Sequence, residues 1–204
     1  MKSKGLLFVF SGPSGVGKGT IMRNFTAAYP DDNFISVSAT TRKPRPGEED
    51  GVHYYFMDET EFVSLADNGG MLEFANFSGN YYGTPKEPVY KTLEEGKNVF
   101  LEIEVQGAAK VKKICPEAIF IFVMPPNMAE LTRRLVDRNT EDPATIELRL
   151  SNAKREIEQA KNYDYIIVNN TIEEAVEELA AIVSSSKCTY GNMKNFIDEV
   201  LKDA

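Results

Sequence analysis

The chain of 204 residues has no tryptophan, one histidine and two cysteines. Cys115 and Cys188 lack metal-ligand spacing, and we expect a reduced pair rather than a disulfide. No apolar run approaches the roughly 20 residues of a membrane-spanning helix. The net charge of −8 argues against nonspecific binding to nucleic acid or to an acidic membrane surface. We therefore expect no nucleic-acid partner, no membrane association and a cytoplasmic location.

Four apolar runs of strand length, at residues 6–10, 99–103, 119–124 and 165–168, lack polar alternation. This pattern is typical of strands buried on both faces of a parallel sheet. Helical patterns fall between and after these runs, at residues 20–29, 106–114, 128–138, 145–161, 172–184 and 190–201. The alternation predicts an α/β fold with helices on both faces of a parallel sheet. Residues 38–88 and 125–149 interrupt the alternation and predict lobes projecting from a single domain.

Residues 11–20, directly after the first apolar run, read SGPSGVGKGT. A strand, a Gly-x-x-x-x-Gly-Lys loop and a helix form the phosphate-binding arrangement in which backbone N–H groups, the helix N-terminus and a lysine face an anionic phosphate chain. An ordinary glycine-rich turn is the alternative. The predicted ATP-phosphate residues are Gly12, Pro13, Ser14, Gly15, Val16, Gly17, Lys18, Gly19 and Thr20.

Gly19 departs from the usual loop, in which a Ser or Thr after the lysine reaches Mg²⁺. Thr20 follows one position later. The protein ligand of the metal is therefore left open, and we expect Mg²⁺ to be held mainly by nucleotide phosphates and water.

A second group of chemically suggestive residues begins with SATTRKPRPGE at residues 38–48. Arg42 and Arg45, followed by Tyr54, offer two guanidinium forks and a phenolic donor, which suit a dianionic phosphate. A charged surface loop is the alternative. Further along, the stretch EFANFSGNYYGT adds the Glu73 carboxylate, Tyr82 and a threonine hydroxyl.

These segments, together with LEIEVQGA and IIVNN, resemble the guanylate kinase family in order and approximate spacing over nearly the whole chain. The resemblance implies a P-loop NTPase-type parallel-sheet core at about 1–37, 89–124 and 150–204. It also implies an inserted GMP-binding lobe at about 38–88 and a lid at about 125–149. The implied reaction transfers the γ-phosphoryl group of ATP to GMP, with Mg²⁺ as cofactor, giving ADP and GDP.

The resemblance also assigns roles by position. Lys18, Arg42, Arg138 and Arg149 are the implied catalytic residues, and Arg134 and Asn169 join the ATP-binding set. The implied GMP-binding residues are Ser38, Arg42, Arg45, Tyr54, Glu73, Tyr82, Thr84 and Glu104, the last a glutamate where the family commonly has aspartate. Chemistry supports Glu73 as the reader of guanine, because a carboxylate accepts from both N1–H and the exocyclic amine.

Two rival functions remain open at this point. One is a guanylate kinase-like domain that binds phosphopeptides without catalysis, and the other is a kinase for a different small phosphate acceptor. The intact lysine loop favours an enzyme over the binding module, and the combination of Glu73 with two hydroxyl residues favours guanine. A homodimer is possible and is left undecided by the sequence.

Overall fold

The computed structural model describes residues 4–77, 79–137 and 143–202. At its centre is a parallel sheet made from β1 (Leu7–Ser11), β2 (Asn33–Ile35), β7 (Asn98–Glu102), β8 (Ile119–Met124) and β9 (Tyr165–Val168). The strand order is β2-β7-β1-β8-β9, so β1 lies in the middle. The predicted parallel sheet is confirmed, and all its strand pairs run parallel.

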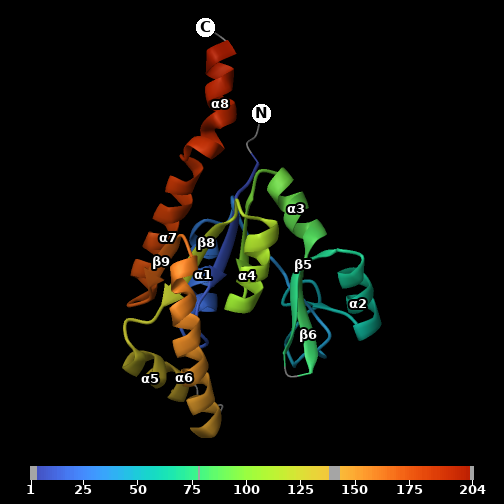
Figure 1. The fold of residues 1–204 in the computed structure, drawn as a ribbon, viewed down its shortest axis with the longest axis vertical. Coiled ribbons are helices and arrows are strands. Elements are labelled where there is room, and N and C mark those ends of the chain that lie inside the picture. Colours follow the sequence, from blue (N-terminus) through green and yellow to red (C-terminus); the bar gives the residue numbers. More distant parts are fainter. Residues whose placement is uncertain (1–3, 78, 138–142, 203–204) are drawn as a thin grey trace.

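Helices cover both faces of this sheet (Figure 1). On one face, Phe8 and Phe10 pack with α1 (Lys18–Ala28) and α7 (Ile172–Lys187). On the other, the intervening residues of β1 pack with α3 (Lys86–Glu94) and α4 (Val105–Ile114). Fully burying an apolar side chain of this size contributes about 1.5–3 kcal/mol, so this two-sided core fixes the position of β1.

A separate small sheet of order β4-β3-β6-β5 projects from the core. It consists of β3 (Ala39–Thr40), β4 (Tyr55–Phe56), β5 (Met71–Phe77) and β6 (Asn80–Pro85), and it mixes parallel and antiparallel pairs. Helix α2 (Glu59–Asp67), which begins with an Asp58 capping box, packs on it through the fully buried Phe62. We call residues 39–85 the small-sheet lobe.

On the other side of the main sheet lies a helix pair, α5 (Met128–Val136) and α6 (Pro143–Ile157) (Figure 1). The pair has its own small core around Leu131, Leu135 and Ala153. A 3-10 turn at Glu158–Asn162 leads from α6 to β9, and α8 (Tyr190–Lys202) follows α7. Helix α8 extends away from the body of the molecule and has no buried residue.

The structure adds two elements that the sequence pattern missed. Strand β2 is short and only half-buried, so it lacks the apolar run by which the other strands were recognised. Helix α3 begins inside a segment expected to belong to the projecting lobe. Among the described residues, no helix is long and apolar enough to span a membrane.

Candidate active site

The phosphate loop has the backbone conformation that its glycines allow. Gly15 and Gly17 have φ values of 85° and 99°, a region that disfavours residues with a Cβ. A Cβ on Gly17 would also lie 2.5 Å from Nδ2 of Asn169, and one on Gly12 would lie 2.3 Å from the Val123 carbonyl oxygen. The loop is therefore held in a tight turn at the carboxyl end of β1, and α1 begins at Lys18 with Gly17 as its N-cap.

Lys18 folds back across this loop. Its Nζ donates to the carbonyl oxygens of Gly12 at 2.6 Å and Pro13 at 3.3 Å. The ammonium group thus lies at the mouth of the loop, beside the N-terminus of α1. Both features favour an anion at this place.

The carboxylate of Glu102, at the end of β7, lies next to Gly19. A Cβ on Gly19 would be 3.5 Å from Oε1 of Glu102. Burial raises the pKa of Glu102, while the positive charges of Lys18 and Arg23 act to lower it. This distance is an ordinary van der Waals contact, so the carboxylate lies directly beside the position at which most such loops have a hydroxyl.

On the α5 side of the loop, Arg134 connects three structural elements. Its Nε donates to Glu130 at 2.7 Å, Nη1 to the Val16 carbonyl at 3.3 Å and Nη2 to the Asn169 carbonyl at 3.0 Å. Asn169, only 2% exposed, donates from Nδ2 to the same Val16 oxygen at 2.7 Å, and its Oδ1 is buried without a partner. These residues line a pocket between the loop, α5 and the start of α7.

Helix α6 also reaches the loop. Arg149 donates from Nη1 to Oγ of Ser14 at 3.1 Å. Further along α6, burial raises the pKa of the Glu156 carboxyl, and the nearby charge of Glu104 adds to this effect, while Lys18 and the backbone of Ser14 act to lower the pKa. The sequence-predicted Arg138 lies outside the described residues.

The predicted acceptor-phosphate residues gather on the small-sheet lobe. The Arg42 guanidinium lies 5.4 Å from the Tyr54 ring centroid, and the rings of Tyr54 and Tyr82 meet edge to face at 6.1 Å. Arg42 is paired with Glu48 at 2.8 Å, and the hydrogen bond that it donates to Glu48 raises the pKa of Arg42, with a smaller contribution from its interaction with Tyr82. Arg45 is exposed and joins the group through its backbone N–H, which donates to Glu48 at 2.7 Å.

Glu73 and Thr84 form the buried end of the same lobe. Thr84 Oγ1 donates to Oε1 of Glu73 at 3.0 Å, and the two residues are 1% and 8% exposed, respectively. Burial raises the pKa of Glu73, and the negative charge of Glu104 adds to this increase. The hydrogen bond from Thr84 and the positive charge of Lys110 act in the opposite direction. A Cβ on Gly107 would lie 2.7 Å from Oε2 of Glu73, so a larger residue on α4 would displace the Glu73 carboxylate.

The other two residues predicted for this end of the lobe are less enclosed. Ser38 is partly buried and contributes a backbone carbonyl that accepts from Tyr55 at 2.9 Å. Glu104 is the exposed N-cap residue of α4. Since the Thr84 hydroxyl already donates to Glu73, the Ser38 hydroxyl is the second candidate donor at this end of the lobe.

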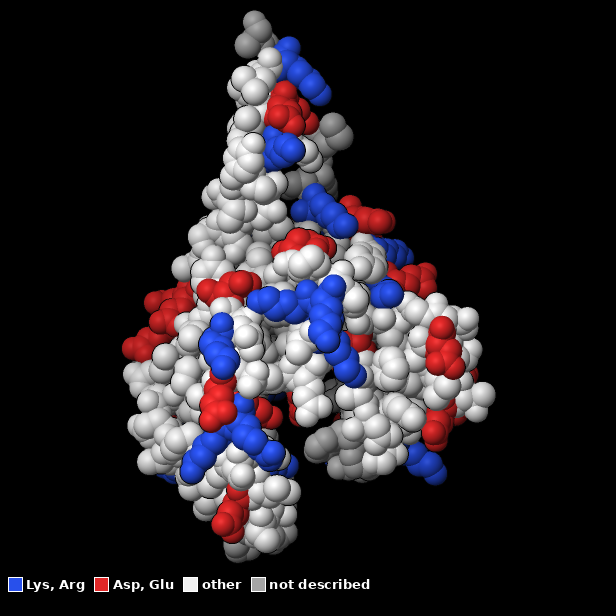
Figure 2. Space-filling model, viewed as in Figure 1, with Lys and Arg blue, Asp and Glu red and all other residues white. Residues whose placement is uncertain are grey.

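A cleft separates the small-sheet lobe from the α5–α6 pair, and basic and acidic side chains alternate on its α5–α6 side (Figure 2). Its walls carry the carboxylates described above, but no cluster of three or more His, Cys, Asp or Glu side chains suited to a metal is found within residues 4–77, 79–137 and 143–202.

Residues 4–186 match the family model described as guanylate kinase. The chain is 48% identical over 200 residues to the guanylate kinase of Clostridioides difficile (strain 630), covering 98% of this chain and 97% of that protein. It is 50% identical over 198 residues to the guanylate kinase of Bacillus anthracis, covering 97% and 96%. The chain belongs to the guanylate kinase family.

A solved structure agrees with this assignment. The crystal structure of guanylate kinase from Anaplasma phagocytophilum matches with a TM-score of 0.74 and 35% identity, covering 92% of this chain and 89% of that one. The family predicted from the sequence motifs is thus confirmed, as is the predicted fold of a parallel core sheet with an inserted lobe, which the structure shows to be a small mixed sheet.

Sequence reasoning did not single out three carboxylates that the structure brings to the guanylate kinase cleft. Glu102 ends a core strand beside the phosphate loop, a place where ligands bind in open parallel sheets. Glu48 stands three residues after Arg45 in the arginine segment, and Glu156 stands seven residues after Arg149, on the same face of α6. The strand-end and helical spacings were the available signals.

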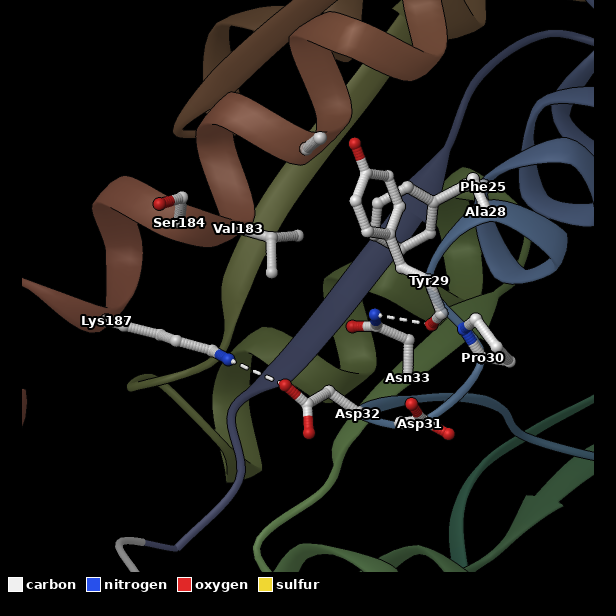
Figure 3. Close-up of a pocket in the computed structure, with 11 residues that line it drawn as sticks. Phe25, Ala28, Tyr29, Pro30, Asp31, Asp32, Asn33, Val183, Ser184 and Lys187 are labelled. Carbon is white, nitrogen blue, oxygen red and sulfur yellow. Dashed lines mark hydrogen bonds and ion pairs between the residues drawn. The ribbon is translucent and has the colours of Figure 1, made fainter.

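A second hollow lies away from this cleft, between the end of α1, the start of β2 and α7 (Figure 3). It is lined mainly by apolar groups, with an ion pair of 3.5 Å between Lys187 and Asp32 at its edge. None of the predicted site residues lines it.

Proposed function

We propose that this guanylate kinase family member transfers the γ-phosphoryl group of ATP to GMP, giving ADP and GDP, with the site residues assigned below. The observation that supports the proposal best is the presence of two anion-binding groups in one chain. The phosphate loop holds the Lys18 ammonium beside the N-terminus of α1, and the small-sheet lobe holds the Arg42 guanidinium against the Tyr54 ring. One group would bind the phosphates of the donor and the other the phosphate of the acceptor.

On the donor side, the loop amides from Gly12 to Thr20 and the Lys18 ammonium would hold the ATP phosphates. Arg134 and Asn169, which line the pocket beside the loop, would border the adenosine. Arg149, already in contact with Ser14, would neutralise charge on the transferring group. Arg138 is assigned the same role from its sequence position alone.

On the acceptor side, Arg42, Arg45, Tyr54 and Tyr82 would bind the GMP phosphate. Glu73 would accept from guanine N1–H and the exocyclic amine, while Ser38 or Thr84 would donate to O6. Thr84 supports the carboxylate in the present arrangement, so it would have to rotate to reach O6. Glu104 would lie near the amine.

Mg²⁺ fits the donor set of this cleft. Magnesium is usually held by one or two carboxylates together with substrate phosphates and water, and the buried Glu102 provides one carboxylate beside Gly19. Glu102, with the hydroxyl of Thr20, the residue after Gly19, would hold the hydrated ion, which would neutralise charge on the nucleotide phosphates.

The protein's own contribution is positioning and electrostatic stabilisation. The GMP phosphate is already an anionic nucleophile, so no general base is required. Because water would compete as acceptor, closing of the lobes only around both substrates would protect ATP from hydrolysis.

The test is a coupled assay of ADP release with GMP, AMP, UMP or no acceptor. Strong turnover with GMP alone supports the proposal. Three results would contradict the proposal: ADP release that does not depend on an acceptor, a preference for AMP or UMP, and nucleotide binding without turnover. Each would indicate a different function.

A further inference from the structure

Glu48 contacts both arginines that are predicted to bind the phosphate of the acceptor. Its Oε2 and Oε1 accept from Nη1 and Nη2 of Arg42 at 2.9 and 2.8 Å. Oε2 also accepts from the backbone N–H of Arg45 at 2.7 Å. One carboxylate therefore holds the side chain of the first arginine and the main chain of the second.

The rest of the surroundings of Arg42 restrain it further. Its Nη1 donates a second hydrogen bond to the Lys43 carbonyl at 2.8 Å, and its guanidinium lies 5.4 and 5.8 Å from the ring centroids of Tyr54 and Phe56. The side chains of Arg42 and Glu48 are only 15% and 18% exposed. This arginine is thus fixed in orientation before any ligand binds.

The fixed orientation determines which donors face a ligand. A guanidinium has five N–H groups, and three of them make the bonds to Glu48 and Lys43. The two that take no part in those bonds are Nε–H and the second N–H of Nη2, which point the same way and form a fork of their own. The Tyr82 hydroxyl, whose interaction with Arg42 helps to raise the pKa of Arg42, is a further donor for a ligand at this place. An arginine fork of this kind binds two oxygens of one phosphate.

We propose that Glu48 is a positioning residue for the acceptor: it holds the outer fork of Arg42 and the turn at Arg45 so that the inner fork of Arg42 faces the phosphate of the nucleoside monophosphate. The inference rests on the proposed function. The hydrogen bonds that Glu48 accepts from the Arg42 side chain and the Arg45 backbone hold the pKa of Glu48 down at about 2, so this carboxylate stays ionised throughout the physiological range.

The alternative role for Glu48 in the same geometry is competition with the GMP phosphate for Arg42. If Glu48 occupied the place of the phosphate, GMP would have to displace it, and removing its charge would tighten GMP binding. If Glu48 positions Arg42, removing its charge weakens GMP binding although the pocket becomes more positive. The two roles therefore predict opposite signs.

The experiment measures binding of GMP and of guanosine, which lacks the phosphate, to the full-length chain by titration calorimetry. Glu48→Gln is expected to weaken GMP binding roughly ten- to a hundredfold, by analogy with the loss caused by removing a group that orients a metal ligand. Guanosine binding and the thermal midpoint should stay unchanged. Glu48→Asp, which keeps the charge with a shorter reach, should give an intermediate loss. Glu49→Gln removes the same charge at the next, exposed position and should behave like the wild type.

A double-mutant cycle shows whether Glu48 acts through its partner. In an Arg42→Lys background, which cannot form the fork, Glu48→Gln should weaken GMP binding far less than in the wild type. In turnover, Glu48→Gln should raise KM for GMP and leave KM for ATP unchanged.

Tighter GMP binding in Glu48→Gln would overturn the inference in favour of competition. Equal losses for GMP and guanosine would reduce Glu48 to a structural residue of the lobe, and full additivity with Arg42→Lys would separate it from the arginine. A wild-type chain that binds neither ligand would instead count against the proposed function itself.

Discussion

The phosphate loop and the small-sheet lobe both face the cleft, but they are constructed in different ways. The loop is one continuous stretch whose anion-binding groups are mostly backbone N–H groups, held in place by glycine conformations and by the buried strand before it. The lobe brings together side chains from separate stretches, and each is held by another side chain, as Arg42 is by Glu48 and Glu73 by Thr84. A loop made of backbone recognises phosphate in general, whereas a lobe made of paired side chains can distinguish one acceptor from another.

The largest effect is expected on the loop side, from Lys18→Met. The change removes a cation directed at charge that shifts between phosphates, a contribution worth roughly 10²–10³ in rate. It should leave the thermal midpoint and GMP binding nearly unchanged, because the lobe is a separate structure. The measurement is kcat for the variant beside Lys91→Met, an exposed control on α3. Normal turnover in a folded Lys18→Met chain would refute the assignment of the loop.

This loop was also the part of the site that the sequence revealed best, because its spacing is local and its neighbours are a strand and a helix. The lobe was predicted only as a set of residues. Glu48 lies only six residues from Arg42 and Thr84 eleven from Glu73, but which of their atoms meet depends on how the turn and the hairpin between them fold. Glu102 and Gly19 are far apart in the sequence and meet only because β7 pairs with β1. Sequence spacing alone does not specify such contacts. Strand β2 escaped for a related reason, since three half-buried residues at a sheet edge carry no periodic signal.

The second prediction tests selectivity on the lobe side, through Glu73→Gln. The amide keeps the shape but replaces one acceptor oxygen with a donor, which should reduce kcat/KM for GMP by about 2–3 kcal/mol, or roughly 30- to 160-fold. AMP, whose N1 is an acceptor, should be affected far less, so the GMP:AMP ratio should shrink. IMP, which lacks the exocyclic amine, should be an intermediate substrate and lose less than GMP.

These values of kcat/KM, measured for all three nucleotides in the wild type and the variant, decide where the base is recognised. An unchanged GMP:AMP ratio would move recognition of guanine to Ser38, Thr84 or Glu104.

The third prediction concerns the contact between α6 and the loop. Arg149→Ala removes the bond to Ser14 and a positive charge beside the loop. Since this charge should act mainly in the transition state, kcat should fall roughly tenfold or more, with a smaller rise in KM for GMP. Arg155→Ala, an exposed arginine on the same helix, is the matched control. An effect confined to KM would make Arg149 a nucleotide-binding residue only.

The smallest expected effect is a shift in the pH dependence of guanosine binding to the small-sheet lobe. Burial raises the pKa of Glu73 above its ordinary value, so the protonated carboxyl is favoured in the folded chain. Its contribution to stability is therefore present at low pH and is lost as the pH rises through the folded-state pKa. Guanine recognition needs the ionised form, so guanosine binding should strengthen as the pH rises through the same range and fall by up to about tenfold per pH unit below it.

The Thr84 hydroxyl stabilises the ionised carboxylate of Glu73. In Thr84→Val the midpoint of guanosine binding should therefore move to higher pH, while the pH dependence of ATP binding stays as in the wild type. Guanosine is the right ligand because it has no phosphate to titrate in the same range. A midpoint that moved down, or did not move, would show that the hydrogen bond between Thr84 and Glu73 does not control the protonation of the base-reading carboxylate. Selectivity would then depend on burial of Glu73 alone.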